Sequence, residues 1–178
     1  MRRILLFVFL ICMIGTMCSC LKTDSNEEYY TVSSTELNQE ASRIYEVALD
    51  AFKNRDITKL ENEFSEYATE NANLNDEIEN AFEFIEGNIT TVEDSYVGYG
   101  GGSTDEKGYA RADYKVTLFD VKTDKNRTYE IRIFGIFFYR NNEHKQGINR
   151  IYVRDKDIEL DVTTDNGKCV VGVAESKL

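Results

Sequence analysis

The fold is decided by residues 109–140, which read YARADYKVTLFDVKTDKNRTYEIRIFGIFFYR. Polar and apolar residues alternate in two runs, 109–121 and 127–140, separated by the polar residues 122–126. Alternation with a period of two is typical of β-strands, and a short polar connection favours an antiparallel hairpin. The sequence therefore predicts two long paired strands at the centre of a curved antiparallel sheet.

The second of these runs changes character toward its end, because residues 134–139 are apolar without alternation. Two interpretations are open. Helices and a neighbouring layer bury both faces of the strand, or Phe137 and Tyr139 line a cavity.

Shorter period-two runs flank the central pair. Residues 89–99 precede it and lead into a glycine-rich stretch, 98–103, that we expect to be a turn. Residues 148–154 follow it after a polar loop at 141–147. The sheet should therefore contain at least four strands in sequence order.

The last segment of the chain, residues 155–178, predicts a C-terminal extension. Acidic and apolar residues alternate over 155–162, and Asp165-Asn166-Gly167 is a strong turn signal before the apolar residues 169–173. We expect these two runs to pair as an extra β-hairpin.

Helices are predicted upstream of the sheet. Ser33 and Glu36 have the spacing of a capping box, and apolar residues then recur at helical spacing as far as Phe52. Asp56 can cap a second helix that carries residues 57–67, and a third helix over 74–85 ends at Gly87. The third helix also carries an acidic row that we interpret as a solvated face. Helices followed by an antiparallel sheet predict the α+β class.

The first twenty residues predict export. Arg2 and Arg3 precede the apolar run 4–14, which is too short to span a bilayer and has the length of a signal-peptide core. The Ser19-Cys20 junction that follows resembles the lipobox of bacterial lipoproteins, in which the cysteine is lipidated and becomes the new N-terminus. That resemblance implies a lipid anchor at Cys20 and a location on the extracytoplasmic face of the cell membrane.

Other outcomes for this segment stay open: lipidation at Cys18, an ordinary signal peptide, or an uncleaved anchor. With lipidation at Cys20, the predicted organisation is a signal peptide at 1–19, a flexible tether at 20–34, an α+β domain at 35–154 and the extension at 155–178.

Charge and cysteine content exclude some function classes. The formal net charge of −11 opposes binding to phosphate backbones, so we expect no nucleic-acid partner. Of the four cysteines, Cys12 and Cys18 leave with the signal peptide and Cys20 is the predicted lipid acceptor. Only Cys169 then remains, so no disulfide framework is expected; a Cys20–Cys169 bridge is possible if Cys20 is not lipidated.

Motifs for catalysis, metals or cofactors are weak. His144 is the single histidine and lies in the polar loop, so neither a zinc site nor a histidine-centred triad is expected. The glycine-rich stretch lacks the Lys-Ser/Thr of a phosphate-binding loop. Asp155, Asp157 and Glu159 have the spacing of a calcium loop, but Leu160 stands where a glycine is needed. We assign no catalytic residues, no metal and no cofactor.

Four stretches look like a family of small bacterial lipoproteins of unknown function, and the order of elements resembles the cone-shaped nuclear-transport-factor-like fold of ketosteroid isomerase. The stretches are 51–56 (AFKNRD), 63–68 (EFSEYA), 81–87 (AFEFIEG) and 147–153 (GINRIYV). The family resemblance implies a location and a fold but no activity. A cone-shaped domain implies an inner pocket, whose candidate lining residues are Tyr45, Phe82, Tyr114, Phe137 and Tyr139.

We therefore expect a noncatalytic lipoprotein whose domain binds a small apolar ligand in the cone or an envelope protein. An exported enzyme is the alternative, in which a carboxylate such as Asp113 and a tyrosine would perform acid–base chemistry. Asp113 and Tyr114 are neighbours on a strand, however, so their side chains should point to opposite faces. A purely structural envelope component is the third hypothesis.

Overall fold

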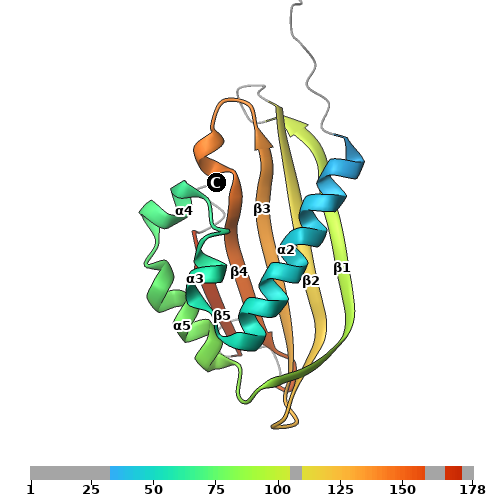
Figure 1. The fold of residues 1–178 in the computed structure, drawn as a ribbon, viewed down its shortest axis with the longest axis vertical. Helices are drawn as coiled ribbons and strands as arrows, with labels where there is room; N and C mark the ends of the chain where they lie inside the picture. Colours follow the sequence, from blue (N-terminus) through green and yellow to red (C-terminus); the bar gives the residue numbers. More distant parts are fainter. Residues whose placement is uncertain (1–32, 105–109, 159–166, 174–178) are drawn as a thin grey trace, which may run out of the picture. The chain divides into compact units, whose positions relative to one another are not determined.

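The computed structural model describes residues 33–104, 110–158 and 167–173 (Figure 1). The predicted signal peptide, nearly all of the tether and Cys20 lie outside these residues, as does the segment 159–166. Among the described residues, no helix is both long and apolar enough to cross a membrane. The helices are α2 (Ser34–Asn54), α3 (Ile57–Glu61), α4 (Glu66–Asn71), α5 (Leu74–Phe84) and the short 3-10 helix η1 (Glu143–Lys145).

The strands form one open antiparallel sheet with the order β1-β2-β3-β4-β5. Helix α2 packs over β1 and β2, whereas α4 and α5 pack against β4 and β5, so the helices cover one face of the sheet (Figure 1). This arrangement confirms the predicted α+β class. The strands are β1 (Ile89–Thr104), β2 (Ala110–Thr123), β3 (Thr128–Tyr139), β4 (Gly147–Asp155) and β5 (Lys168–Gly172).

Helix α2 begins as predicted. The Ser33 hydroxyl accepts a hydrogen bond from the backbone N–H of Glu36, and the Glu36 carboxylate accepts one from the backbone N–H of Ser33. This reciprocal capping box satisfies two donors that the first helical turn leaves without partners. The Asp56 side chain caps α3 in the same manner, through the backbone N–H of Lys59.

The prediction of a single helix over residues 57–67 is wrong in one respect. The structure has two short helices there, α3 and α4, which are separated at Phe64. Phe64 makes an isolated parallel bridge to Ile148 of β4. The backbone N–H of Ile148 donates to the carbonyl of Glu63 at 2.7 Å, and the N–H of Ser65 donates to the carbonyl of Ile148 at 2.8 Å. Hydrogen bonds to the sheet thus replace those that a continuous helix would have made.

The glycine-rich turn predicted at 98–103 is also wrong, since β1 continues through this stretch to Thr104. Its backbone pairs with β2, as in Gly102↔Ala112, with one register shift between Tyr99 and Gly102. Glycine weakens a strand but does not prevent one where a neighbouring strand supplies hydrogen bonds. The residues that follow, 105–109, lie outside the described part of the chain.

The described part of the C-terminal extension includes strand β5, which joins the main sheet. Strand β5 pairs with β4 in the register Arg154↔Lys168 and Val153↔Cys169, and it is an edge of that sheet. The predicted hairpin partner of this strand is the run 155–162, of which residues 159–162 lie outside the described part of the chain. An exposed strand edge is a ready template for backbone pairing, and β4 offers that edge to β5.

The hydrophobic core lies between the helices and the covered face of the sheet. Apolar residues from α2, α3 and α5 meet alternate residues of the central strands. The largest fully buried side chains include Tyr129, Ile131, Ile133, Ile148 and Ile151. Period-two alternation then places the next residue of each strand on the opposite face, which the helices do not cover.

Candidate functional site

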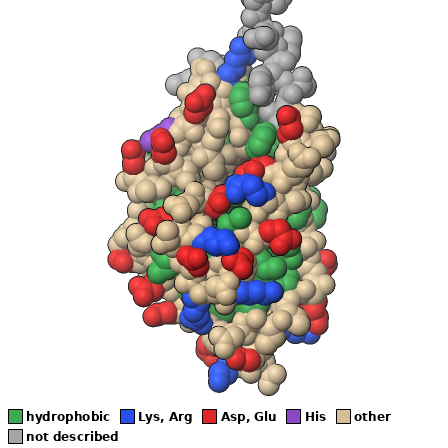
Figure 2. All heavy atoms as spheres, viewed as in Figure 1, with side chains coloured by type: hydrophobic (Ala, Val, Ile, Leu, Met, Phe, Trp, Pro, Cys, Tyr) green, Lys and Arg blue, Asp and Glu red, His purple; other side chains and the backbone are tan. Residues whose placement is uncertain are grey.

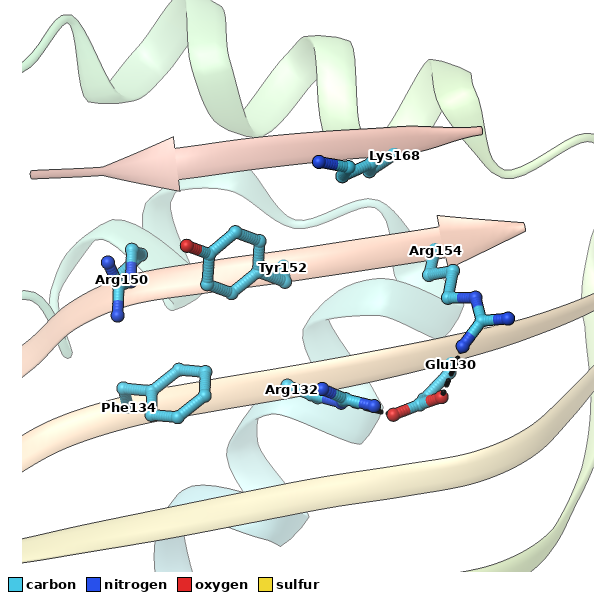
Figure 3. Close-up of a pocket in the computed structure, with 7 residues that line it drawn as sticks. All are labelled: Glu130, Arg132, Phe134, Arg150, Tyr152, Arg154 and Lys168. Carbon is cyan, nitrogen blue, oxygen red and sulfur yellow. Dashed lines mark hydrogen bonds and ion pairs between the residues drawn. The ribbon is translucent and has the colours of Figure 1, made fainter. Parts of the chain in front are cut away.

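The face of the sheet opposite the helices carries a pocket of about 340 Å³. Figure 3 shows its side chains rising from three neighbouring strands, with the helices behind the sheet. The strand register makes these residues cross-strand neighbours, since Phe134 pairs with Arg150 and Arg132 pairs with Tyr152. The described lining residues are Glu130, Arg132 and Phe134 of β3, Arg150, Tyr152 and Arg154 of β4, and Lys168 of β5.

The charge of this pocket is opposite to that of the chain. Its described lining residues include four cationic side chains and one carboxylate, a formal charge of +3, whereas the chain carries −11. Like charges this close together repel one another, which makes the grouping unfavourable unless something negative compensates it. The pocket therefore concentrates positive potential on an otherwise acidic molecule.

Glu130 provides part of that compensation at one end of the pocket. It is buried, with 5% of its surface exposed, and its carboxylate accepts a hydrogen bond from Arg132 Nε. Arg154 Nη1 lies 3.8 Å from its other oxygen, as an ion pair. A carboxylate held this way fixes the orientation of two guanidinium groups. Lys168, whose backbone pairs with that of Arg154 on the neighbouring strand, adds a third cation to the described lining beside these two.

The other end is aromatic. The rings of Phe134 and Tyr152 meet edge to face, with centroids 5.8 Å apart and an interplanar angle of 86°. The Arg150 guanidinium carbon lies 5.2 Å from the Phe134 centroid and 4.8 Å from that of Tyr152. Lys115 Nζ approaches the Phe134 ring as well, at 5.5 Å from its centroid. These cation–π contacts hold Arg150 and Lys115 beside a flat apolar surface.

The five side chains predicted to line an inner pocket lie elsewhere than in the open-face pocket. Phe82 and Tyr114 are buried in the core between helices and sheet. Tyr45 and Phe137 pack against that core from its margin. Tyr139 lies near the end of β3, where the Arg111 guanidinium approaches its ring at 5.9 Å. These five are not among the described residues that line the open-face pocket.

Tyr114 has an unusual environment for a tyrosine. Its hydroxyl is buried and makes no hydrogen bond with any described residue. Burial raises the pKa of this phenol well above its ordinary value of about 10, and the negative charge of Glu40 adds to the shift. The neighbouring Asp113 points to the other face, where it pairs with Arg111 at 2.6 Å, as expected for adjacent strand positions.

The sequence places His144 in a polar loop, but in the structure its side chain contacts two carboxylates. It lies in η1, with Nδ1 at 2.9 Å from Glu66 Oε2 and Nε2 at 3.0 Å from Glu70 Oε2. These carboxylates raise the pKa of the imidazole above its usual value, most of all through the Glu66 hydrogen bond. Both acids belong to α4, so this histidine ties the loop to a helix.

In the part of the chain that the structure describes, few residues are placed to bind a metal ion or to act as a thiol nucleophile. There, no three His, Cys, Asp or Glu side chains are grouped closely enough to hold a metal ion. Cys169 is a free, half-buried thiol on β5, and burial raises its pKa, which makes it a poor nucleophile.

Sequence reasoning missed the open-face pocket, although a signal for it exists. Residues 130–134 read E-x-R-x-F and residues 150–154 read R-x-Y-x-R, so each strand carries charged and aromatic residues at every second position. Such alternation predicts one polar face per strand. It does not reveal that the two runs lie side by side, because that depends on the strand register.

Residues 47–166 match a family described as a domain of unknown function, DUF5104. The chain belongs to this family. The DUF5104 match begins inside α2 and continues past β4, and it contains every described pocket residue except Lys168. It also continues beyond residue 153, the last residue of the four stretches quoted for the family resemblance. No curated protein matches the chain.

Proposed function

We propose that this member of the DUF5104 family is an exported, lipid-anchored and noncatalytic binding module whose ligand is an anion. The observation that carries this proposal is the pocket with a formal charge of +3 on a chain with a net charge of −11. Pockets of about 300–1,000 Å³ accommodate small molecules, and this one falls at the lower end of that range.

The chemistry of the pocket favours binding over catalysis. The carboxylate of Glu130 is engaged by Arg132 and Arg154. The hydroxyl of Tyr152 points toward Arg150 and away from Glu130 (Figure 3). An acid–base enzyme of the ketosteroid isomerase type needs a carboxylate and an oxyanion-stabilising hydroxyl that converge on one substrate. Guanidinium groups, in contrast, are suited to bind carboxylates and phosphates in a bidentate manner.

The ligand differs from the apolar one expected from the sequence. The sequence predicts an apolar ligand inside a cone lined by residues such as Phe82 and Tyr114. In the structure, these two side chains belong to the packed core between the helices and the sheet. The open face combines charge with aromatic rings, so its ligand must carry negative charge to be attracted there.

Anion binding can be tested on the full chain purified in detergent, with citrate as the probe at constant ionic strength. Citrate should raise the melting temperature, because a ligand that binds the folded state stabilises it. Lys168→Gln removes one pocket cation, leaves the Glu130, Arg132 and Arg154 residues themselves unaltered, and should reduce that rise. Lys53→Gln, an exposed cation on α2, should leave it unchanged. An equal rise in all three proteins would contradict binding in this pocket.

The lipid anchor rests on the sequence alone, on the Arg2-Arg3 region, the apolar run 4–14 and the Ser19-Cys20 junction. Bacteria expressing the full chain can be fed an alkyne-labelled palmitate. We expect the label on the wild type and on the matched variant Cys18→Ala, but not on Cys20→Ala. Labelling of Cys20→Ala equal to that of the wild type would contradict an anchor at this residue.

A further inference from the structure

We infer that the ligand of the open-face pocket joins an oxyanion group to a planar ring, as an aromatic carboxylate or an aryl phosphate does. This inference rests on the proposed anion binding and adds the chemical class of the ligand. It follows from the two unlike ends of the pocket, which Figure 3 shows at opposite sides of the same hollow.

The oxyanion belongs at the end formed by Arg132, Arg154 and Lys168. Glu130 cancels one of these three charges and orients the two guanidinium groups. Side chains of Arg132 and Arg154 remain 43% and 36% exposed, so their outer N–H groups are accessible from the pocket. An oxyanion placed there receives charge-assisted hydrogen bonds from groups whose positions are already fixed.

The ring belongs at the end formed by Phe134, Tyr152 and Arg150. Because the two aromatic rings are nearly perpendicular, at 86°, the pair presents both a ring face and a ring edge. Arg150 is 5% exposed and lies over both rings, so its planar guanidinium is held in place. A flat ligand ring can stack on the aromatic face that this pair presents, which an aliphatic chain does less well.

The charge outside the pocket limits the size of the ligand. A long polyanion or an anionic bilayer would extend beyond the pocket and meet the acidic surface of the remaining chain, which outweighs the local +3. A small molecule experiences mainly the local field within a Debye length of about 8–10 Å. The volume of about 340 Å³ agrees with such a ligand.

The inference can be tested by nuclear magnetic resonance titration of the full chain in detergent micelles. The probes are phenyl phosphate, which has both groups, and glycerol 3-phosphate, which has the oxyanion of a lipid headgroup but no ring. We expect phenyl phosphate to bind about tenfold more tightly, since stacking and cation–π contacts of about 1–2 kcal/mol correspond to roughly that factor. Phe134→Leu should remove most of the difference.

Tyr96→Leu is the matched control, because Tyr96 is an exposed aromatic residue on β1 outside the pocket. It should leave both affinities unchanged. Equal affinity of the wild type for the two phosphates would overturn the ring subsite while the proposed anion binding stands. Absence of binding by either phosphate, together with no citrate effect, would overturn both proposals. A tenfold preference that survives Phe134→Leu would place the ring elsewhere and overturn the assignment.

Discussion

The two faces of the sheet are built from neighbouring residues of the same strands, yet their chemistry is opposite. On β3, Ile131 and Ile133 are fully buried under the helices, while Arg132 and Phe134 face the open side. On β4, Ile151 and Val153 alternate in the same way with Tyr152 and Arg154. The covered face therefore supplies the apolar core, whereas the open face carries charged and aromatic side chains.

The outer surface of the molecule extends this comparison. Figure 2 views the helix-covered side, where acidic side chains are spread over the surface. The predicted acidic row is exposed to solvent: Asp76, Glu79 and Glu83 lie on α5, and Glu86 follows its end. Figure 2 also shows Lys and Arg side chains dispersed among the acidic ones on this side, whereas the described lining of the pocket groups four cations with one carboxylate. Such a group of cations is easier to explain by a ligand than by stability, because grouped cations repel one another.

The largest expected effect comes from adjacent residues on the two faces. Ile133→Ala should lower the free energy of unfolding by about 2–5 kcal/mol, since it leaves a cavity in a packed core. Phe134→Ala should cost about 1 kcal/mol, the approximate value of its aromatic pairing with Tyr152. Urea denaturation of both variants measures the difference. Similar losses would show that the open face also supports the fold.

A smaller effect is expected inside the pocket, from Glu130→Gln. The substitution removes the charge that Arg132 and Arg154 share, and we expect a loss of about 1–3 kcal/mol because a buried charged hydrogen bond is broken. Glu93→Gln breaks an exposed ion pair with Lys122 on the same sheet and should change stability by less than about 0.5 kcal/mol. Chemical denaturation that gave equal values for both would contradict a special role for Glu130.

A pH effect should come from His144, in the short helix η1 between β3 and β4. Glu66 and Glu70 raise the pKa of its imidazole, so the charged form is favoured in the folded state. Its contribution to stability is fully present below the unfolded pKa of about 6.5 and is lost as the pH rises through the higher folded pKa. Histidine resonances followed by pH titration should show the raised pKa in the wild type and a lower one in Glu66→Gln. An unchanged pKa in that variant would disprove the assigned cause.

The smallest effect is expected at Tyr114, on the covered face. Tyr114→Phe removes a buried hydroxyl that has no hydrogen-bond partner among the described residues. Because an unsatisfied buried group costs free energy, stability should stay the same or rise by up to about 1 kcal/mol. Thermal and urea denaturation of this variant test the expectation. A clear loss of stability would indicate that the hydroxyl has a bonding role in the fold.

Local signals in the sequence were sufficient for much of the fold. The capping box of Ser33 and Glu36 located the start of α2, and period-two alternation located β2 and β3 within a few residues. The same reasoning failed at the glycine-rich stretch, which is part of β1, and at Phe64, which bridges to Ile148. In both places a partner distant in sequence decided the local structure. The lipid anchor at Cys20 and the resemblance to the cone-shaped nuclear-transport-factor-like fold remain predictions.

What the sequence determined by itself is the set of elements and their amphipathic patterns, because capping, helical periodicity and strand alternation depend on residues close together in the chain. What only the tertiary structure decided is which strands lie next to one another and which face the helices cover. Arg132 meets Tyr152, and Lys168 meets Arg154, only through the register of β3, β4 and β5. The pocket exists because that register brings together charges and rings from three strands, and no local pattern specifies a register between distant strands.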